Sequence, residues 1–328
     1  PSWKRSACRC GRSSPTRGIR DRIMGSAPRM RWPAAYFLAI CDDGSKLACA
    51  RRYDVVLVDL RSRKILYRCR PIPHPWCVAF SPDSCRLAVA SAHGVTALLD
   101  TSSGIPVGFT TAGRDQGCST AFTSDGRLLE GKWNGDLILT SENGEIVGRE
   151  LHPGEMISRI SHDATRRLWL IQHTRKPVRP DESPKDYLTL RIWPEWNRSV
   201  RTFDLGGHVE SATLSPDGQF VAYLERWENQ VCVLRISDGK VLATGGPIRT
   251  GGSGFELAWS LDCRYLGIVT KTGFSIVDAK DLTVKGTVSC KFPSALGFHP
   301  DHKNVVFGTW ERSALLSFDA LLGNDTPI

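Results

Sequence analysis

The stretch LSPDGQFVA, residues 214–222, combines an apolar residue, a Ser-Pro-Asp-Gly turn and a second apolar segment. In such a turn the Asp side chain bonds its own backbone two residues on, Pro fixes φ and Gly accepts positive φ, so the chain reverses in a tight hairpin. The same unit occurs six more times. Its other versions are CDDGSKLA from Cys41, FSPDSCRLA from Phe80, FTSDGRLL from Phe122, ISHDATRRLW from Ile160, WSLDCRYLG from Trp259 and FHPDHKNVV from Phe298.

The spacing of these turns predicts a repeat architecture. Five of the six intervals between the shared aspartates are close to the 40 to 45 residues of a four-stranded propeller blade. Two further strand-like segments follow each turn, as residues 55–60 and 64–69 do in the first unit. We therefore expect an all-β protein, a seven-bladed β-propeller of four-stranded antiparallel blades with little helix. The aspartates are Asp43, Asp83, Asp125, Asp163, Asp217, Asp262 and Asp301, separated by 40, 42, 38, 54, 45 and 39 residues.

The first strand of each unit has a second regularity. A bulky residue lies three positions before each aspartate and a small one lies four before it, except that the fourth unit has Arg159 there. Because strand side chains alternate, the bulky set should fill the space between blades and the small set should face the axis. Arg159 is thus predicted to point into the central channel, and Glu256, six before Asp262, also faces it. Arg159 is either a hydrated arginine with a local partner or a contact for an anion or ligand.

Residues 34–320 resemble the WD-repeat family in a degenerate form with SPDG-type turns, although such turns also occur in other propeller families. Gly207-His208 is the one clear Gly-His pair, and the Trp of the family's Trp-Asp pair is missing. The resemblance implies a non-catalytic scaffold that binds a protein or peptide through loops on one rim. The aspartates that end third strands, where the family places its Trp-Asp pair, are Asp59, Asp100, Asp278 and Asp319.

The charge is concentrated at the start of the chain. The net charge is +9, and residues 1–31 contain nine basic residues against Asp21. We expect residues 1–31 to be a flexible basic tail, 32–322 the propeller and 323–328 a C-terminal tail. Nucleic acid is then a partner only through the first segment. Blade seven lacks an outer strand in the sequence pattern, and Arg22–Met30 lies at the right distance to supply it.

Motifs for catalysis or metal binding are absent from the sequence. It contains no HExxH, GxSxG, P-loop or paired-cysteine zinc spacing. The eight histidines mostly adjoin Pro, Gly or Asp, which favours solvated turn positions over metal ligands, and the eleven cysteines are expected to be reduced. We therefore expect no enzyme activity, no cofactor and no metal.

Nothing in the sequence indicates a membrane span, because there is no run of about eighteen apolar residues. We expect a monomeric cytoplasmic propeller. The Arg- and Ser-rich start leaves open a targeting segment or a mis-assigned start ahead of Met24 or Met30.

The predicted partner surface lies on the face opposite the Asp turns, where the second and third strands are joined. Three of these loops pair a tryptophan with a basic residue, and Trp and Arg are enriched at binding hot spots. These residues are predicted to form a rim for a protein or peptide of acidic character: Arg51, Arg52, Lys132, Trp133, Arg226, Trp227, Trp310 and Arg312.

Alternatives to this rim remain open. Each tryptophan can instead fold back over its own blade. A propeller enzyme or small-ligand binder using the channel, or nucleic-acid contact through the tail, is also possible. The insertion from His173 to Asp186 is expected to be an exposed loop, with or without a function.

Overall fold

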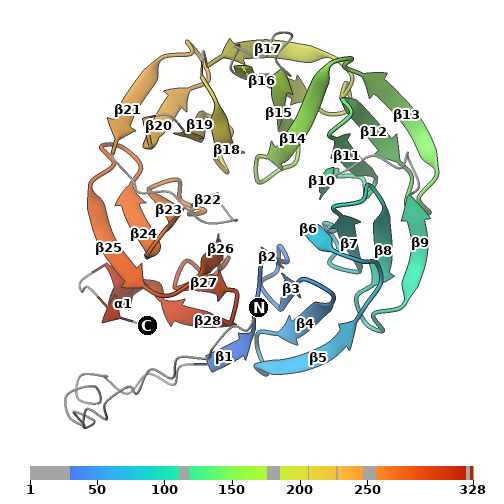
Figure 1. Ribbon diagram of the computed structural model, residues 1–328, viewed down its shortest axis with the longest axis horizontal. Coiled ribbons are helices and arrows are strands. Elements are labelled where there is room, and N and C mark those ends of the chain that lie inside the picture. The colour runs from blue at the N-terminus through green and yellow to red at the C-terminus, as the bar shows by residue number, and fades with distance from the viewer. Residues whose placement is uncertain are drawn as a thin grey trace, which may run out of the picture.

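Seven antiparallel sheets stand around a central axis in the computed structural model of the protein, so the predicted seven-bladed β-propeller is confirmed (Figure 1). The structure describes residues 30–110, 118–175, 185–205, 207–226, 228–246, 256–322 and 326–327. The one helix in this part of the chain, α1 (Phe318–Leu321), is four residues long. No helix in these ranges is long and apolar enough to cross a membrane.

The strands follow one another from the axis outward in each of the first six blades. Blade one has β2 (Phe37–Ile40), β3 (Lys46–Ala50), β4 (Val55–Asp59) and β5 (Lys64–Cys69), and blade two has β6 (Pro75–Phe80), β7 (Arg86–Ser91), β8 (Thr96–Asp100) and β9 (Pro106–Thr110). Blade three has β10 (Cys118–Phe122), β11 (Leu128–Lys132), β12 (Asp136–Thr140) and β13 (Ile146–Leu151), and blade four has β14 (Glu155–His162), β15 (Leu168–Arg175), β16 (Lys185–Ile192) and β17 (Ser199–Asp204). Blade five has β18 (Val209–Leu214), β19 (Phe220–Glu225), β20 (Gln230–Arg235) and β21 (Val241–Gly245), and blade six has β22 (Leu257–Trp259), β23 (Tyr265–Thr270), β24 (Gly273–Asp278) and β25 (Val284–Ser289).

Blade seven is completed by a strand from the other end of the chain. Its inner strands are β26 (Pro293–Phe298), β27 (Asn304–Thr309) and β28 (Arg312–Ser317), and β1 (Met30–Pro33) pairs antiparallel with β28 at the outer edge. This strand begins where the predicted segment Arg22–Met30 ends, and residues 22–29 lie outside the described part. Trp32 is buried with 5% exposure, so β1 contributes to the core as well as to pairing. A short strand, β29 (Thr326–Pro327), pairs parallel with β25 of blade six.

The Asp turns are built as their composition predicts. In blade five Ser215 Oγ donates to Asp217 Oδ1 at 2.6 Å, and Gln219 N donates to the same oxygen at 3.0 Å. Gly218 has φ +69°, the left-handed conformation that glycine adopts without strain. The hydroxyl and the carboxylate thus hold the turn through hydrogen bonds within the turn itself.

The turn of blade four corrects one sequence assignment. Across the blade-five turn Ser215 N donates to Phe220 O, and the equivalent bond in blade four runs from Asp163 N to Leu168 O at 3.0 Å. Asp163 therefore occupies the serine position, and Thr165 takes the place of the shared aspartate. Thr165 Oγ1 donates to Asp163 Oδ2 at 2.5 Å, which is the same hydrogen bond with its two partners exchanged. The assignment of Asp163 as a shared aspartate was wrong by two residues.

This shift places Arg159 in a different ring of channel residues. Counted from Thr165, Arg159 lies six positions back, as Glu256 does from Asp262. The strand pairing agrees, because an irregularity precedes Arg159 in β14 as one precedes Cys77 in β6. The small residue of blade four is Ser161, so the ring of small residues has no exception. Since the shift is an even number, Arg159 still faces the channel as predicted.

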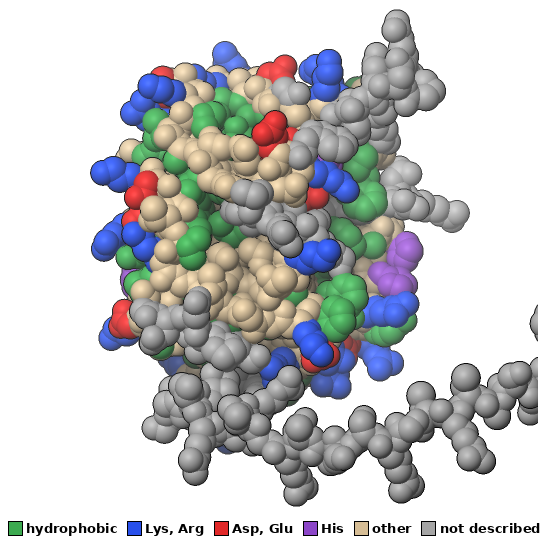
Figure 2. All heavy atoms as spheres, turned by 60° about the vertical axis from the view of Figure 1, so that its left-hand side comes forward, with side chains coloured by type: hydrophobic (Ala, Val, Ile, Leu, Met, Phe, Trp, Pro, Cys, Tyr) green, Lys and Arg blue, Asp and Glu red, His purple; other side chains and the backbone are tan. Residues whose placement is uncertain are grey.

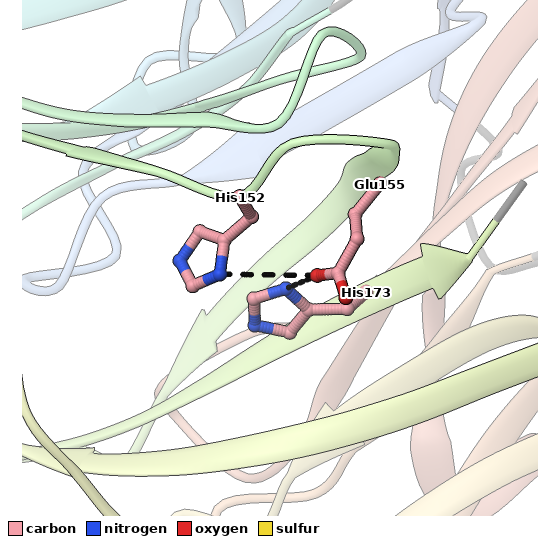
Figure 3. Close-up of side chains that lie close together, drawn as sticks. All are labelled: His152, Glu155 and His173. Carbon is pink, nitrogen blue, oxygen red and sulfur yellow. Dashed lines mark ion pairs between the residues drawn. The ribbon is translucent and has the colours of Figure 1, made fainter.

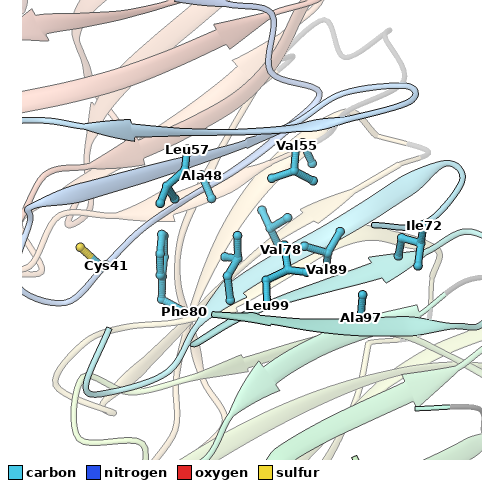
Figure 4. Packing of buried hydrophobic residues seen from close by; sticks show 12 residues of the cluster. Cys41, Ala48, Val55, Leu57, Ile72, Val78, Phe80, Val89, Ala97 and Leu99 are labelled. Carbon is cyan, nitrogen blue, oxygen red and sulfur yellow. The ribbon is translucent and has the colours of Figure 1, made fainter. Parts of the chain in front are cut away.

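The core consists of separate apolar clusters between neighbouring blades. Figure 4 shows one of them, where Ala48 and Leu57 of blade one face Phe80 and Val89 of blade two. Four bulky residues of the first strands are at least 93% buried, as the alternation predicts: Phe80, Phe122, Leu214 and Trp259. The second and third strands are apolar on both sides because each of their faces meets another blade.

The described cysteines lie mostly inside these clusters. Cys49 is fully buried in β3, and burial raises the pKa of its thiol to about 12. Such a thiol is unreactive at neutral pH. Eight cysteines of the described part are unpaired: Cys41, Cys49, Cys69, Cys77, Cys85, Cys232, Cys263 and Cys290.

Candidate functional site

Exposed aromatic side chains gather on the face opposite the Asp turns. The ring of Trp310 stacks on that of Phe292 with centroids 5.6 Å apart and lies 5.6 Å from that of Tyr36. Phe37 and Trp76 form a second pair at 5.1 Å. Trp76, Trp310 and Phe292 are 39%, 45% and 54% exposed, which is unusual for rings of this size. We call these five residues the aromatic groove.

A cavity of about 470 Å³ opens along this groove. Blades one, two and seven contribute to it, through the segments that enter their first strands and the loops between their second and third strands. Its lining residues are Tyr36, Phe37, Arg52, His74, Pro75, Trp76, Ala92, His93, Ser294 and Trp310.

A cation lies at the blade-one end of the cavity. The guanidinium of Arg52 lies over the ring of Tyr53, 5.1 Å from its centroid. Tyr53 is 53% exposed and lies 5.8 Å from the ring of His74, which in turn contacts that of His93 at 5.2 Å. Arg52 therefore adds a positive charge to a surface that is otherwise aromatic.

Three of the predicted rim cations are held by the protein itself or partly covered. Arg51 Nε donates to Asp54 Oδ1 at 2.5 Å, and Arg226 Nε lies 3.3 Å from Glu210 Oε1. Arg312 is half-buried beside the groove. Of the predicted cations, Arg52 is the exposed one that lines the groove.

The three predicted tryptophans differ in position. Trp310 belongs to the aromatic groove, and Trp133 is half-buried with its ring edge-on to Trp76 at 6.0 Å. Trp227 lies outside the described residues. The groove thus contains one predicted tryptophan and is bordered by a second.

The placement of Lys132 on an exposed rim was wrong. Its side chain is fully buried at the end of β11, where Nζ donates to Gly94 O at 2.9 Å and lies 3.4 Å from Glu130 Oε1. Thr110 also donates to that Glu130 oxygen, at 3.1 Å. Lys132 therefore stabilises the packing of blade three against blade two and is not available to a partner.

The central channel contains the two predicted charged residues. Arg159 and Glu256 line one cavity of about 500 Å³ with Phe37, Trp76 and Trp133, so the channel opens beside the aromatic groove. Leu296 N donates to Glu256 Oε2 at 3.3 Å. Burial raises the pKa of Glu256 to about 7, and the positive charge of Arg159 opposes that rise.

Arg166 crosses the opposite end of the channel. From the blade-four turn its guanidinium donates to both carboxylate oxygens of Asp42 in blade one, at 2.8 and 3.0 Å. The same group donates to Phe122 O at 2.8 Å. Because one side chain joins the inner ends of blades one, three and four, the channel is narrowed on the Asp-turn face and accessible from the aromatic face.

Sequence reasoning missed most of the aromatic groove. It considered the loops between second and third strands, whereas Tyr36, Trp76 and Phe292 lie where the chain enters a first strand. Both sets of segments reach the same face in a meander. An aromatic residue shortly before the first strand of adjacent repeats was the available signal.

The histidine prediction was also incomplete. His173, expected in a solvated loop with Asp186, is fully buried in β15, and Asp186 is 1% exposed in β16. The insertion is therefore shorter than predicted, and residues 176–184 lie outside the described part. The two strands continue further because their extra residues pair with one another, from Thr174 with Asp186 to Arg175 with Lys185.

The geometry defines a seven-bladed β-propeller with a concave aromatic face. No protein-family model and no curated protein matches the sequence. Hydrazine synthase from Kuenenia stuttgartiensis is a similar solved structure, with a TM-score of 0.73 and 15% identity over 90% of this chain and 98% of that one. The β-propeller domain of Cps50 (Swd1) from Myceliophteria thermophila gives a TM-score of 0.71 and 13% identity over 88% and 98%. At these identities the likeness shows the fold, which an enzyme shares with a propeller domain of another kind.

Proposed function

We propose that the protein is a degenerate WD-repeat propeller that works as a non-catalytic platform and binds a peptide segment of a partner in the aromatic groove. The observation that carries this proposal is the aromatic groove along a cavity, in which Trp76, Trp310 and the adjoining Phe292 are exposed and Tyr36 and Phe37 are half-buried. Concave apolar surface of this kind on a monomer marks an interaction site. The residue types match those enriched at binding hot spots.

The chemistry of the groove favours a particular kind of peptide. The exposed rings favour an aromatic or leucine side chain that packs against them, and Arg52 favours a neighbouring Asp or Glu. The described lining contains no carboxylate and no thiol, and its serine, Ser294, already donates to Ala35 O at 2.5 Å. These features support recognition rather than bond-making chemistry.

A selection from a displayed random-peptide library on the full chain tests the proposal. Enriched peptides should contain an aromatic residue or leucine beside an acidic residue, and a fluorescently labelled copy should bind in an anisotropy assay. Trp76→Ala and Trp310→Ala should each weaken that binding by about tenfold or more, because truncation of a hot-spot ring removes most of its contact area.

The matched control is Phe109→Ala on the outer strand β9. The side chain of Phe109 is 48% exposed, a fraction similar to the 45% of Trp310. Phe109 lies on the outer circumference of the ring, away from the groove. The Phe109→Ala variant should bind the peptide with unchanged affinity. If both tryptophan variants bind the peptide as tightly as the unchanged protein does, or if the selected peptides bind without contacting any groove residue, the binding site lies elsewhere.

The channel supports a second candidate function, the binding of a small zwitterion. Arg159 and Glu256 share one cavity, and a guanidinium with a nearby carboxyl matches a ligand that carries both a carboxylate and an ammonium group. A panel of free amino acids screened by thermal shift tests this idea. A shift that disappears in Arg159→Gln supports channel binding, and no shift with any amino acid removes it.

A further inference from the structure

Two histidines and a glutamate converge on the aromatic-groove side of blade four. His152 lies in the link from β13 to β14, Glu155 begins β14 and His173 lies in β15 (Figure 3). Nδ1 of His173 is 3.3 Å from Glu155 Oε2, and Nδ1 of His152 is 3.8 Å from the same oxygen. The three potential ligand atoms lie within 4.8 Å of one another.

The other nitrogen of each ring lies close to a separate oxygen, which for His173 is a hydrogen-bond partner. Nε2 of His152 lies 3.1 Å from Glu150 Oε1, and Nε2 of His173 lies 3.0 Å from Thr189 Oγ1. Histidines that bind metals have this arrangement, in which an outer carboxylate or oxygen orients the ring and the inner nitrogen faces the ion. His173 is fully buried, and its Nδ1 has no hydrogen-bond partner in the described part of the chain.

We propose that His152, Glu155 and His173 bind a Zn²⁺ ion through their two Nδ1 atoms and a carboxylate oxygen. Two imidazoles and a carboxylate form a donor set that suits Zn²⁺ and disfavours Mg²⁺ and Ca²⁺, which take oxygen ligands. Bonds of about 2.0 to 2.1 Å in a tetrahedron place ligand atoms about 3.3 Å apart. The pair at 3.3 Å already meets that spacing. His152 lies in a turn, where a small displacement brings it into place.

One cation lies beside the three proposed ligands and competes for Glu155. Arg175 is the competing cation, with Nε 3.3 Å from Glu155 Oε1 and a side chain that is 62% exposed. Three protein ligands leave a fourth position for water or another group.

Calorimetric titration of the chelator-treated full chain with Zn²⁺ alone tests the site. The expected result is one zinc ion per chain with a micromolar or lower dissociation constant. His152→Ala and Glu155→Gln should each weaken binding by about tenfold or more. His302→Ala is the matched control, because His302 is an exposed turn histidine on the opposite face, and it should bind as the unchanged protein does.

A second variant guards against a loss of binding that reflects unfolding. Arg175→Ala removes an exposed cation beside Glu155, so it should tighten zinc binding several-fold, which no unfolding effect would do. Circular dichroism of each variant with chelator present verifies the fold. No zinc binding at 100 µM, or one zinc equivalent that survives both His152→Ala and Glu155→Gln, would overturn the proposal.

Discussion

At the scale of single residues, two buried cations each connect their own blade to another blade. Lys132 and Arg166 both follow an apolar strand or turn in the sequence, where cations are usually solvated. In the structure each donates to a backbone carbonyl of another blade and meets a carboxylate, Glu130 or Asp42. No pattern within a single repeat predicts these links between blades, because Gly94 lies 38 residues from Lys132 and Asp42 lies 124 residues from Arg166.

Arg166→Met should lower the free energy of unfolding by about 2 kcal/mol, because hydrogen bonds to a buried charged group are lost. The measurement is a urea titration followed by fluorescence. Arg235→Met is the control, since Arg235 makes a similar two-point contact with Asp238 at 2.7 and 3.1 Å on an exposed surface. Its unfolding midpoint should hardly move. A midpoint in Arg166→Met equal to that of Arg235→Met would show that the bridge across the channel does not stabilise the ring.

Glu256→Gln should make the protein more stable at pH 8 and leave it unchanged near pH 4. The pKa of Glu256 rises from 4.5 to about 7 on folding, so between these values the folded state binds more protons than the unfolded state. Stability then falls as the pH rises through this window, by about 1 to 3 kcal/mol for this group. Urea midpoints measured every half pH unit detect the effect. Parallel curves for the two proteins would contradict it.

At the scale of elements, the local chemistry of the hairpin turns made the inner strands predictable. The contacts between distant parts of the chain have no such local pattern and could not be predicted. The Asp turn is a local structure whose hydrogen bonds link residues two apart, as from Ser215 to Asp217, so six of the seven turns could be placed from sequence. The blade-four turn was misplaced because Asp163 and Thr165 exchange roles without changing the bond. The aromatic groove was mostly missed because blade-to-blade links carry no such local signature.

The strand β1 should be needed for stability, whereas the residues before it should not. A version that starts at Met30 keeps the pairing with β28 and should retain its thermal midpoint. A version that starts at Ala34 loses this strand together with buried Trp32, and removal of a buried tryptophan alone costs about 3 to 5 kcal/mol. Calorimetry of the two versions checks this. Equal midpoints would show that blade seven does not depend on its fourth strand.

At the scale of the whole molecule, charge is evenly mixed outside the first segment. Figure 2 shows cationic and anionic side chains interspersed over the described surface of one side of the ring. Residues 30–328 contain 35 basic and 33 acidic residues, against 43 and 34 in the full chain. The propeller therefore has little electrostatic attraction for a polyanion. Overall charge and repeat number could both be obtained from sequence because each is a sum over the chain, whereas the geometries of the groove and of the proposed zinc site depend on single contacts.

Binding to a 30-nucleotide single strand should distinguish the two parts of the molecule. We expect the full chain to shift the oligonucleotide in a gel at 50 mM salt, and this shift should weaken steeply as salt is raised. The version that starts at Met30 should not shift it. If both versions shift the strand equally, the propeller body itself contacts nucleic acid and the charge argument fails.

The pairing of β1 with β28 has a consequence for synthesis on the ribosome. Ser313 Oγ donates to Pro33 O across 280 residues, so the strand that closes the ring leaves the ribosome long before its partner does. At 5 to 20 residues per second the delay is roughly 15 to 60 s. During this time Leu47, Val56 and Val58 of blade one lack Val306, the blade-seven residue that packs against them in the finished protein. Blade one is therefore the first blade to be made, and its face toward blade seven is the last part of it to be covered.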